Sequence, residues 1–304
     1  MIILDLPDFF RKPSPDTYPP FKHGRYMEEY FYDFILKNID NFKHINYTYI
    51  PVFWTNLQVS SDFSSKKEYY NEFLKDIFEQ YKSEKFFTIV QHDDCVLLNI
   101  PKKTIVFGAC SGHVALPLIY EDTNNTLENI VDISKNLVCS FIGSETHSIR
   151  TLLKSISIPN YYIYIKGWDS KVPTNDIEHF INITKRSMYT LAPRGYGRNS
   201  FRYFECFLLN AIPIYIYDDI NWLPYQDIID YSKFSITIHE SELCNIESIL
   251  NSISKESYEK MLLELKNHKH FFNLEYMCTY LIKQLENIKN IPVLHEGKQS
   301  MTFL

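Results

Sequence analysis

The sequence has no long basic run, no long apolar run and no closely spaced cysteine pair, and each absence excludes a class of protein. Its 31 Lys and Arg against 37 Asp and Glu give a formal charge of −6, which makes nucleic acid an unfavourable main partner. No stretch approaches the roughly 20 apolar residues that a membrane-spanning helix needs, so we expect no membrane span. The six cysteines are scattered, with no CxxC pair and no Cys/His cluster at zinc spacing. We therefore expect reduced thiols and no bound metal.

The first residues, Met1 to Pro7, are too short an apolar run and too acidic for a secretory signal. On this ground the sequence predicts a cytoplasmic protein.

Strand-length apolar runs alternate with helical patterns along the 304 residues, which predicts parallel α/β sheets. A polar stretch around 120–136 interrupts the pattern, which then restarts. We therefore predict an N-terminal lobe over 1–133 and a C-terminal lobe over 134–304, each with an α/β fold. The expected strands are 86–90, 104–107, 114–119, 137–142, 161–165, 188–192, 212–217 and 234–238, and 47–54 is expected to be a strand running into a loop. The expected helices are 25–37, 66–82, 149–155, 176–187, one from about 201, and helices over 241–288.

The stretch 187–205 is the most informative segment of the chain. An apolar strand leads into a loop that contains Gly195 and Gly197, and Asn199 or Ser200 can cap the helix that follows. Such a loop at the carboxyl end of a parallel strand directs backbone N–H groups and the positive end of a helix at one point, which suits a diphosphate. Glycines before a helix are equally typical of an ordinary turn.

Charged residues flank this loop. Arg194, Arg198 and Arg202 can add charge-assisted hydrogen bonds to a diphosphate. Glu205 lies three residues after Arg202, near the same helix face, and its carboxylate can accept hydrogen bonds from two ribose hydroxyls. The loop therefore predicts a nucleotide site.

A pair of acids, Asp218 and Asp219, follows the next apolar strand. Asp218 can contact hydroxyls of a donor sugar, and the pair can hold a divalent metal. A polar turn after a core strand gives the same pattern. The spacing is not Asp-x-Asp, so we predict no metal site here.

This part of the sequence resembles the exostosin-like glycosyltransferases, glycosyltransferase family 47. The resemblance is specific over 185–240 and weaker upstream, and it covers about 20–285. Its motifs are Arg186-Ser187-Met188-Tyr189, Pro193-Arg194-Gly195-Tyr196-Gly197, Ser200-Phe201-Arg202-Tyr203-Phe204-Glu205, Ile212-Pro213-Ile214, Asp218-Asp219, Leu223-Pro224-Tyr225, Tyr231-Ser232-Lys233-Phe234-Ser235, and upstream Tyr26-Met27-Glu28-Glu29-Tyr30-Phe31 and His92-Asp93-Asp94.

The resemblance implies a GT-B fold, in which two Rossmann-like lobes with parallel sheets face each other across a cleft. It implies a hexosyl- or pentosyltransferase that moves a sugar with inversion from a nucleoside-diphosphate sugar, UDP-linked by analogy, to a hydroxyl of a glycan acceptor. No metal and no other cofactor would be required. Two departures stand out: Cys95 replaces a common family glycine, and Asn210-Ala211 stands where Gly-Cys is usual.

Inverting transfer needs a general base and a stabilised leaving group. We assign the leaving diphosphate to the 195–202 segment with Arg150 and Arg194. Three residues remain alternatives for the base, namely Asp93, His92 and Glu29. A turn cap and a solvated helix face explain the two carboxylates equally well.

Two other functions remain open. A carbohydrate- or nucleotide-binding protein could keep the fold without turnover. A dinucleotide-dependent oxidoreductase is less consistent with the sequence, because no Gly-x-Gly-x-x-Gly follows the first strand.

Overall fold

The computed structural model of the protein describes residues 1–13, 24–81, 85–127, 133–168 and 172–304. These residues form two compact units. Unit 1 contains the start of the chain, Gly24–Glu121 and Asn273–Leu304, and unit 2 contains Asp122–Phe272.

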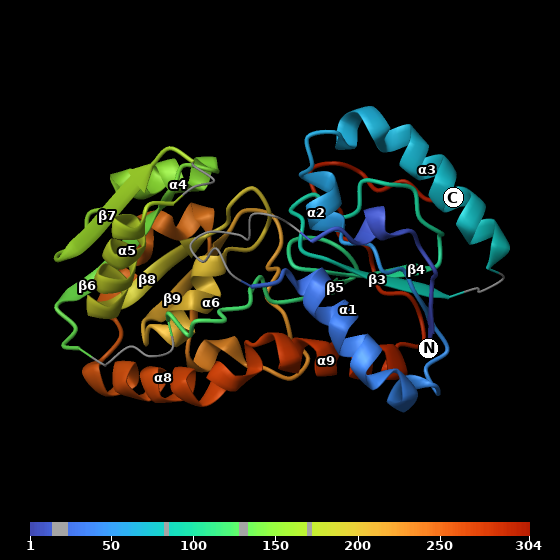
Figure 1. The fold of residues 1–304 in the computed structure, drawn as a ribbon. Helices are drawn as coiled ribbons and strands as arrows, with labels where there is room; N and C mark the ends of the chain where they lie inside the picture. Colours follow the sequence, from blue (N-terminus) through green and yellow to red (C-terminus); the bar gives the residue numbers. More distant parts are fainter. Residues whose placement is uncertain (14–23, 82–84, 128–132, 169–171) are drawn as a thin grey trace. The chain divides into compact units, whose positions relative to one another are not determined.

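Unit 1 is built on a five-stranded sheet in which every neighbouring pair is parallel and the strands follow chain order (Figure 1). The two longest strands, β3 and β4, are buried along their whole length, as expected for parallel strands inside an α/β layer. The edge strand β1 has only two residues, too few for its pattern to be recognised from sequence. The strands are β1 (Ile2–Ile3), β2 (Thr48–Tyr49), β3 (Phe86–Val90), β4 (Thr104–Gly108) and β5 (Val114–Ala115).

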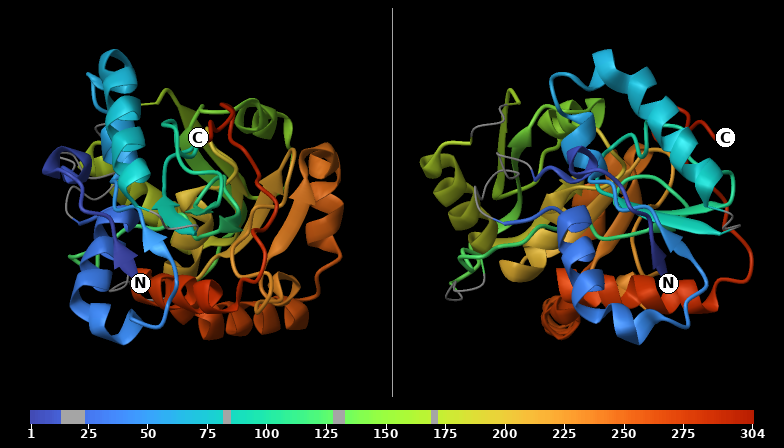
Figure 2. Two further views of the ribbon diagram at one scale, coloured as in Figure 1. Left: turned by 90° about the vertical axis from the view of Figure 1, so that its right-hand side faces the viewer. Right: turned by 45° about the vertical axis from the view of Figure 1, so that its right-hand side comes forward.

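The helices of unit 1 come from both ends of the chain, and α1 packs against α9 (Figures 1 and 2). Helix α1 buries Met27, Phe31 and Ile35 at intervals of four residues, and α9 buries Met277 and Leu281 at the same interval. The helices are α1 (Met27–Asn38), α2 (Trp54–Gln58), α3 (Phe63–Gln80) and α9 (Leu274–Asn287), with 3₁₀ turns η1 (Asp8–Arg11) and η2 (Ile39–Phe42).

The C-terminal part of the chain corrects the predicted division at residue 133. From Asn273 onward the chain belongs to unit 1, and the boundary within the chain falls at Glu121. The tail pairs with unit 1 through isolated β-bridges of His295 with Gly112 and of Phe303 with Ile100. The amphipathic pattern of α9 predicts a buried face but does not say which lobe covers it, and this is why the sequence misplaced the helix.

Unit 2 has a second five-stranded parallel sheet, in the order β7-β6-β8-β9-β10. Numbered within the unit, this order is 2-1-3-4-5, one of the common doubly wound arrangements. The strands are β6 (Leu137–Ser144), β7 (Tyr161–Lys166), β8 (Ser187–Pro193), β9 (Ile212–Tyr217) and β10 (Ile236–His239). The two units together confirm the prediction of two Rossmann-like α/β lobes.

The helices of unit 2 pack around an aromatic core. The Phe207 ring lies 5.8 Å from Tyr203, 5.6 Å from Phe234 and 4.4 Å from Phe272, measured between ring centroids. The helices are α4 (Ser148–Leu152), α5 (Thr174–Arg186), α6 (Phe201–Leu208), α7 (Ile246–Asn251) and α8 (Lys255–His268), with 3₁₀ turns η3 (Leu153–Ser155), η4 (Tyr231–Lys233), η5 (Glu240–Asn245) and η6 (Lys269–Phe271).

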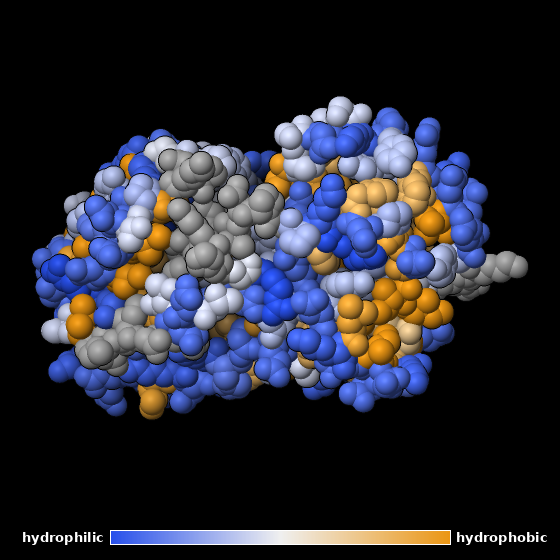
Figure 3. Space-filling model, viewed as in Figure 1, coloured by the Kyte–Doolittle hydropathy of each residue, from blue (hydrophilic) through white to orange (hydrophobic). Residues whose placement is uncertain are grey.

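Hydrophilic residues cover much of the face drawn in Figure 3, interrupted by hydrophobic patches. Exposed aliphatic side chains include Ile2 and Leu36 in unit 1. Within the described residues, no helix has the length and apolar character required to cross a bilayer.

Candidate functional site

The topology of unit 2 creates a switch point between β6 and β8. The chain leaves β6 toward β7 on one side of the sheet, whereas β8, β9 and β10 extend the sheet on the other side. In open α/β sheets, ligands bind outside the carboxyl ends of the strands at such a point. The loop after Ser144 and the loop after Pro193 both begin there.

Arg150 ties these two strand ends together. It lies on α4, is 9% exposed, and its Nε donates to the carbonyl of Arg194 at 3.0 Å. Its other nitrogens donate to the carbonyls of Ser144 at 2.9 Å and of Pro193 at 3.4 Å. The guanidinium is therefore a fixed positive charge at the switch point, held by backbone oxygens rather than extended from the surface.

Arg194 follows β8 and pairs with an acid at the end of β9. Its NH1 lies 2.7 Å from Asp218 Oδ1, and its NH2 donates to the carbonyl of Tyr196 at 3.0 Å. His147 Nε2 lies 3.5 Å from the other oxygen of Asp218. Burial alone would raise the pKa of Asp218, but the hydrogen bond and charge of Arg194, together with His147, hold it below its usual value.

His147 was not singled out from the sequence, although it lies in the same loop after β6 that led us to Arg150. Its Nδ1 accepts the N–H of Ile149 at 3.4 Å, so it caps α4 while its Nε2 faces Asp218. A second histidine, His239 at the end of β10, donates from Nε2 to the carbonyl of Asp218 at 2.9 Å. Asp218 is therefore held by three strand ends, and the structure uses it to orient Arg194.

The loop from Gly195 to Ser200 is folded back on itself. Gly195 N donates to the carbonyl of Asn199 at 3.4 Å, and Asn199 Oδ1 accepts the N–H of Ser200 at 2.9 Å. Ser200 is the N-cap residue of α6, but its side chain makes no capping hydrogen bond. Asn199 and Gly197 are both buried.

Two buried polar atoms beside Gly195 have no hydrogen-bond partner in the described structure, Arg194 Nε and Thr146 Oγ1. A Cβ at Gly195 would lie 3.3 Å from Arg150 NH2, a tight contact, and 3.5 Å from Thr146 Oγ1, an ordinary one, so this glycine lies directly beside both groups. Leaving a buried donor unpaired costs about 1–3 kcal/mol. A ligand that brings acceptor oxygens to this point would satisfy both atoms.

The remaining charged residues of the motif are Arg202, Arg198 and Glu205. The guanidinium of Arg202 packs over the rings of Phe141 at 5.2 Å and Phe180 at 4.5 Å, which is a cation–π position. Arg198 pairs with Asp219, with 2.7 Å from Nε to Oδ2. Glu205 lies one turn into α6 and is 7% exposed.

In unit 1, His92 and Asp93 form the turn that follows β3. Asp94 N donates to His92 Nδ1 at 3.2 Å, and Cys110 Sγ lies 3.4 Å from Asp93 Oδ1. Burial lowers the pKa of His92, and the charges of Asp93 and Asp94 offset this only in part. His92 is therefore neutral at pH 7, and a neutral imidazole can accept a proton.

Glu29 lies on the first turn of α1 and accepts a hydrogen bond of 2.5 Å from Asn56 Nδ2 on α2. Its neighbour Glu28 is the carboxylate that bonds the end of β3, because Glu28 Oε1 accepts the N–H of Gln91 at 3.0 Å. Burial raises the pKa of Glu28 against these hydrogen bonds. The sequence reasoning did not identify Glu28 as a separate buried group.

Among the described residues, no three His, Cys, Asp or Glu side chains are grouped so that they could hold a metal ion. Metal independence stays a prediction.

The strand order 2-1-3-4-5 defines unit 2 as a Rossmann-like unit with fixed charges at its switch point. The family follows from a profile described as the Exostosin GT47 domain, which matches residues 91–253, just over half of the chain. The chain belongs to the exostosin GT47 family. The match spans the His92 turn of unit 1 and the whole switch-point site of unit 2.

Individual similarities are short. A probable glycosyltransferase of Arabidopsis thaliana is 29% identical over 97 residues, which is 32% of this chain and 20% of the relative. A probable glucuronosyltransferase of Oryza sativa subsp. japonica is 35% identical over 69 residues, 23% of this chain and 16% of the relative. The chain thus spans a fifth or less of the length of these relatives.

Among solved structures, WaaG, a glycosyltransferase involved in lipopolysaccharide biosynthesis, aligns with 86% of this chain and 96% of its own, at 8% identity and a TM-score of 0.42.

Proposed function

We propose that the protein transfers a sugar from a nucleoside-diphosphate sugar to a hydroxyl of a glycan acceptor. UDP is the nucleotide that the family resemblance favours, and transfer proceeds with inversion and without a bound metal. The observation that carries the proposal is the pair of unsatisfied buried groups at the switch point, Arg194 Nε and Thr146 Oγ1, beside the loop that begins at Gly195. A diphosphate supplies the acceptor oxygens that they lack.

In this proposal the donor site lies wholly in unit 2. The loop amides and the start of α6 face the diphosphate, Arg194 adds a charge-assisted hydrogen bond, and Glu205 accepts from the ribose. Arg150 acts through its carbonyl contacts, which hold the ends of β6 and β8 together. The bond between the anomeric carbon and the diphosphate oxygen breaks, and the diphosphate leaves with the electron pair.

The acceptor hydroxyl oxygen forms the new bond to the anomeric carbon and gives its proton to a base. His92, Asp93 and Glu29 remain the three candidates. The lowered pKa of His92 is consistent with this role, because a neutral imidazole can accept a proton at neutral pH. A pH–rate profile tests the assignment: a base with a histidine pKa gives an acid limb that disappears in His92→Gln.

A second function has support from the same site. The guanidinium of Arg202 packs over two phenylalanine rings, and Arg150 is engaged by three carbonyls. Asp218 also balances the charge of Arg194. A site with this little free positive charge is compatible with a protein that binds a nucleotide sugar and does not turn it over.

The testing experiment is a thermal-shift titration with UDP, GDP, CMP and NAD, with and without EDTA. A ligand that binds the native state raises the melting temperature by mass action. We expect a shift with UDP alone that survives EDTA and is lost in Arg194→Lys and Glu205→Gln. Arg186→Lys is the matched control, because Arg186 is a surface residue of the same unit bonded to Asn136.

If GDP raises the melting temperature and UDP does not, the donor nucleotide is GDP. If none of the nucleotides raises the melting temperature, the donor site is wrong. UDP-sugar hydrolysis, measured on the same protein, separates the enzyme from the binding protein. UDP-glucuronate belongs in that screen, since one relative is named a probable glucuronosyltransferase.

A further inference from the structure

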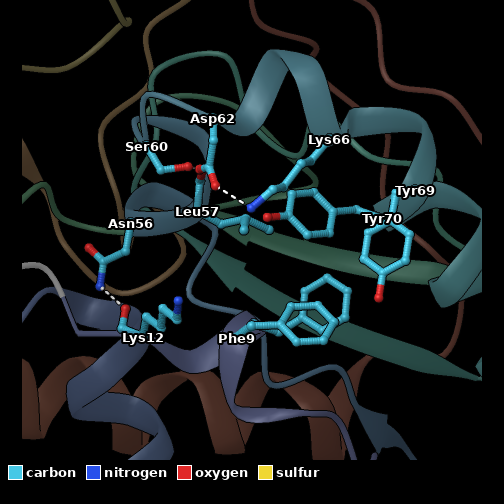
Figure 4. A pocket seen from close by; sticks show the side chains of 10 residues that line it. Phe9, Lys12, Asn56, Leu57, Ser60, Asp62, Lys66, Tyr69 and Tyr70 are labelled. Atoms are coloured by element: carbon cyan, nitrogen blue, oxygen red, sulfur yellow. Dashed lines mark hydrogen bonds and ion pairs between the residues drawn. The ribbon is translucent and has the colours of Figure 1, made fainter.

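Unit 1 contains a pocket of about 560 Å³ that the donor site does not use (Figure 4). This volume falls within the range of small-molecule sites, ~300–1,000 Å³. The pocket is lined by η1 and the residue after it, by α2, by the turn after α2 and by the start of α3, with Phe9, Asn56, Ser60, Asp62, Lys66 and Tyr69 among the lining residues.

The topology of unit 1 explains the position of the pocket. Turn η1 follows β1 and helix α2 follows β2, so both leave the sheet at the carboxyl ends of neighbouring parallel strands. The two segments are joined where Phe53 N donates to the carbonyl of Phe10 at 2.9 Å. The pocket therefore lies at the edge of the sheet where α/β proteins bind ligands.

One wall of the pocket is aromatic. The ring of Phe9 lies 4.5 Å from Phe10, 5.9 Å from Tyr70 and 6.3 Å from Tyr69, and the two tyrosine rings are 5.8 Å apart. Mutual packing fixes these rings, yet Tyr69 is 54% exposed. A rigid, partly exposed aromatic surface can bind the apolar face of a ligand at little cost in side-chain entropy.

The opposite side of the pocket is polar, and the amide of Asn56 has one unpaired hydrogen-bonding atom there. Asn56 Nδ2 donates to the carbonyl of Lys12 at 3.0 Å and to Glu29 Oε1 at 2.5 Å, which uses both of its protons and sets the orientation of the amide. Its Oδ1 is buried and has no partner in the described structure. A ligand that brings a hydrogen-bond donor would supply the partner that this oxygen lacks.

Further polar groups line the same side. Asp62 and Lys66 form an ion pair with 2.5 Å between Oδ2 and Nζ, and Ser60 contributes a hydroxyl. These groups can both donate and accept. An aromatic wall facing amide, hydroxyl and carboxylate groups matches a pyranose ring, which has C–H bonds on one face and hydroxyls around its edge.

We propose that this pocket binds a sugar residue of the glycan acceptor, with the ring stacked on Tyr69 and a hydroxyl donating to Asn56 Oδ1. That this sugar belongs to a glycan acceptor rests on the proposed function, whereas binding of a sugar in the pocket does not. Through Asn56 the bound sugar is one hydrogen bond from Glu29, one of the three candidate bases.

The test is saturation-transfer-difference NMR on the full chain with methyl glycosides of glucose, galactose, mannose, N-acetylglucosamine, xylose and glucuronic acid at millimolar concentration. We expect at least one glycoside to bind and the affinity to fall about tenfold in Tyr69→Ala and in Asn56→Ala. Tyr69→Phe keeps the ring and should bind as the unmodified protein does. The matched control is Tyr164→Ala, a 41% exposed tyrosine of unit 2.

UDP titration of the same variants separates this inference from the proposed function. Glycoside binding that depends on Tyr69 supports the pocket, even if no nucleotide binds and the donor site fails. The inference is overturned if no glycoside binds, or if binding survives both Tyr69→Ala and Asn56→Ala in folded protein. If UDP still binds in that case, the proposed donor site is unaffected. A UDP shift lost in Tyr69→Ala would also overturn it, because the pocket would then hold the nucleotide.

Discussion

Both units place polar side chains after the carboxyl ends of their parallel strands, but the two sets differ in charge. In unit 2 the set contains the guanidinium groups of Arg150, Arg194 and Arg198, balanced in part by Asp218 and Asp219. In unit 1 the corresponding set contains carboxylates, an imidazole and aromatic rings. This difference agrees with the two proposals, which place an anionic ligand in unit 2 and a hydroxyl-bearing ligand in unit 1.

The two sets also differ in how they are held. In unit 2, Arg150 and Asp218 are fixed by strand ends of a single continuous segment, Asp122–Phe272. In unit 1 the turn with two of the candidate bases, His92 and Asp93, is held by the far end of the chain. Lys298 N donates to Asp94 Oδ1 at 3.2 Å, and Gln299 Nε2 donates to Asp94 Oδ2 at 3.4 Å. The switch-point site of unit 2 therefore depends on one continuous segment of the chain, and the turn of unit 1 depends on the tail.

The largest effect is expected from Arg194→Ala. Its side chain is 9% exposed and balances Asp218, so removing it leaves this partly buried carboxylate with the contact of His147. We expect UDP affinity to fall by about 100-fold, because the proposed charge-assisted hydrogen bond to the diphosphate is lost, and calorimetry measures this change. Arg198→Ala is the comparison, because its partner Asp219 is 39% exposed, and an exposed pair contributes less than about 1 kcal/mol.

Equal losses in the two arginine variants would contradict the special position of Arg194. A double-mutant cycle with Asp218→Asn sharpens the test. If the cost of Arg194→Ala comes from the orphaned carboxylate, then Asp218→Asn restores part of the stability but not UDP affinity.

The dependence of unit 1 on the tail predicts a smaller effect for Gly297→Ala. A Cβ there would lie 2.8 Å from Asp94 Cα and 3.1 Å from the carbonyl oxygen of Asp93, and both are backbone atoms that cannot rotate away. We expect a loss of about 1–3 kcal/mol in the free energy of unfolding, measured by urea denaturation.

Gly167→Ala is the matched control in unit 2, because a Cβ at Gly167 meets nothing within 4 Å. It should change stability by less than about 0.5 kcal/mol. In Gly297→Ala we also expect sugar transfer to slow while UDP affinity stays unchanged. A loss of UDP affinity in that variant would show that the tail supports more than the His92 turn.

His113 gives unit 1 a dependence on pH. Burial and the neighbouring charge of His295 lower the pKa of His113 from 6.5 to about 4, and its Nδ1 accepts the N–H of Val106 at 3.0 Å. The unfolded chain therefore binds more protons between pH 6.5 and 4, so stability is present above this window and is lost as pH falls through it. With solvent screening at a partly exposed group, we expect a loss on the order of 1 kcal/mol.

Denaturation curves at pH 7 and pH 4.5 measure this loss, and His113→Gln should reduce it because glutamine can accept the same hydrogen bond without titrating. An unchanged pH dependence in His113→Gln would assign the effect to other groups.

Much of the fold could be predicted from sequence, because strand-length apolar runs and helical periodicity are local signals. The predicted strands at 86–90 and 212–217 agree with β3 and β9, and the helix expected from about 201 agrees with α6. The run 47–54 was predicted to be a strand running into a loop, and two of its residues form β2 before the chain leads into α2, which was not predicted. The missed features are non-local. No sequence pattern in α9 or in the tail predicts that these segments pack against unit 1.

The candidate site divides in the same way. Arg150, Arg194, Gly195 and Asp218 lie together as their positions at strand ends predicted. The orientation of Arg202 could not be predicted, because its cation–π contacts depend on Phe141 and Phe180, which the fold brings near from elsewhere. The ligand roles of Glu205, Asn199 and Ser200 stay predictions.

The smallest effect is expected where the sequence departs from family glycines, once in each unit. Cys95 has φ +66° and Asn210 has φ +54°, both in the left-handed region where glycine is unstrained. Asn210 follows α6, and Ala211 N donates to the carbonyl of Cys206 at 3.1 Å, the hydrogen bond of a Schellman helix end. Asparagine tolerates this conformation better than other non-glycine residues, so Asn210→Gly should change stability by less than about 0.5 kcal/mol and Asn210→Ala should cost about 1 kcal/mol.

Cys95→Gly relieves the same strain but removes a fully buried side chain, so we expect it to be less stable than Asn210→Gly. Melting temperatures of the three variants decide this, and a stabilised Cys95→Gly would mean that strain outweighs packing in the turn beside His92.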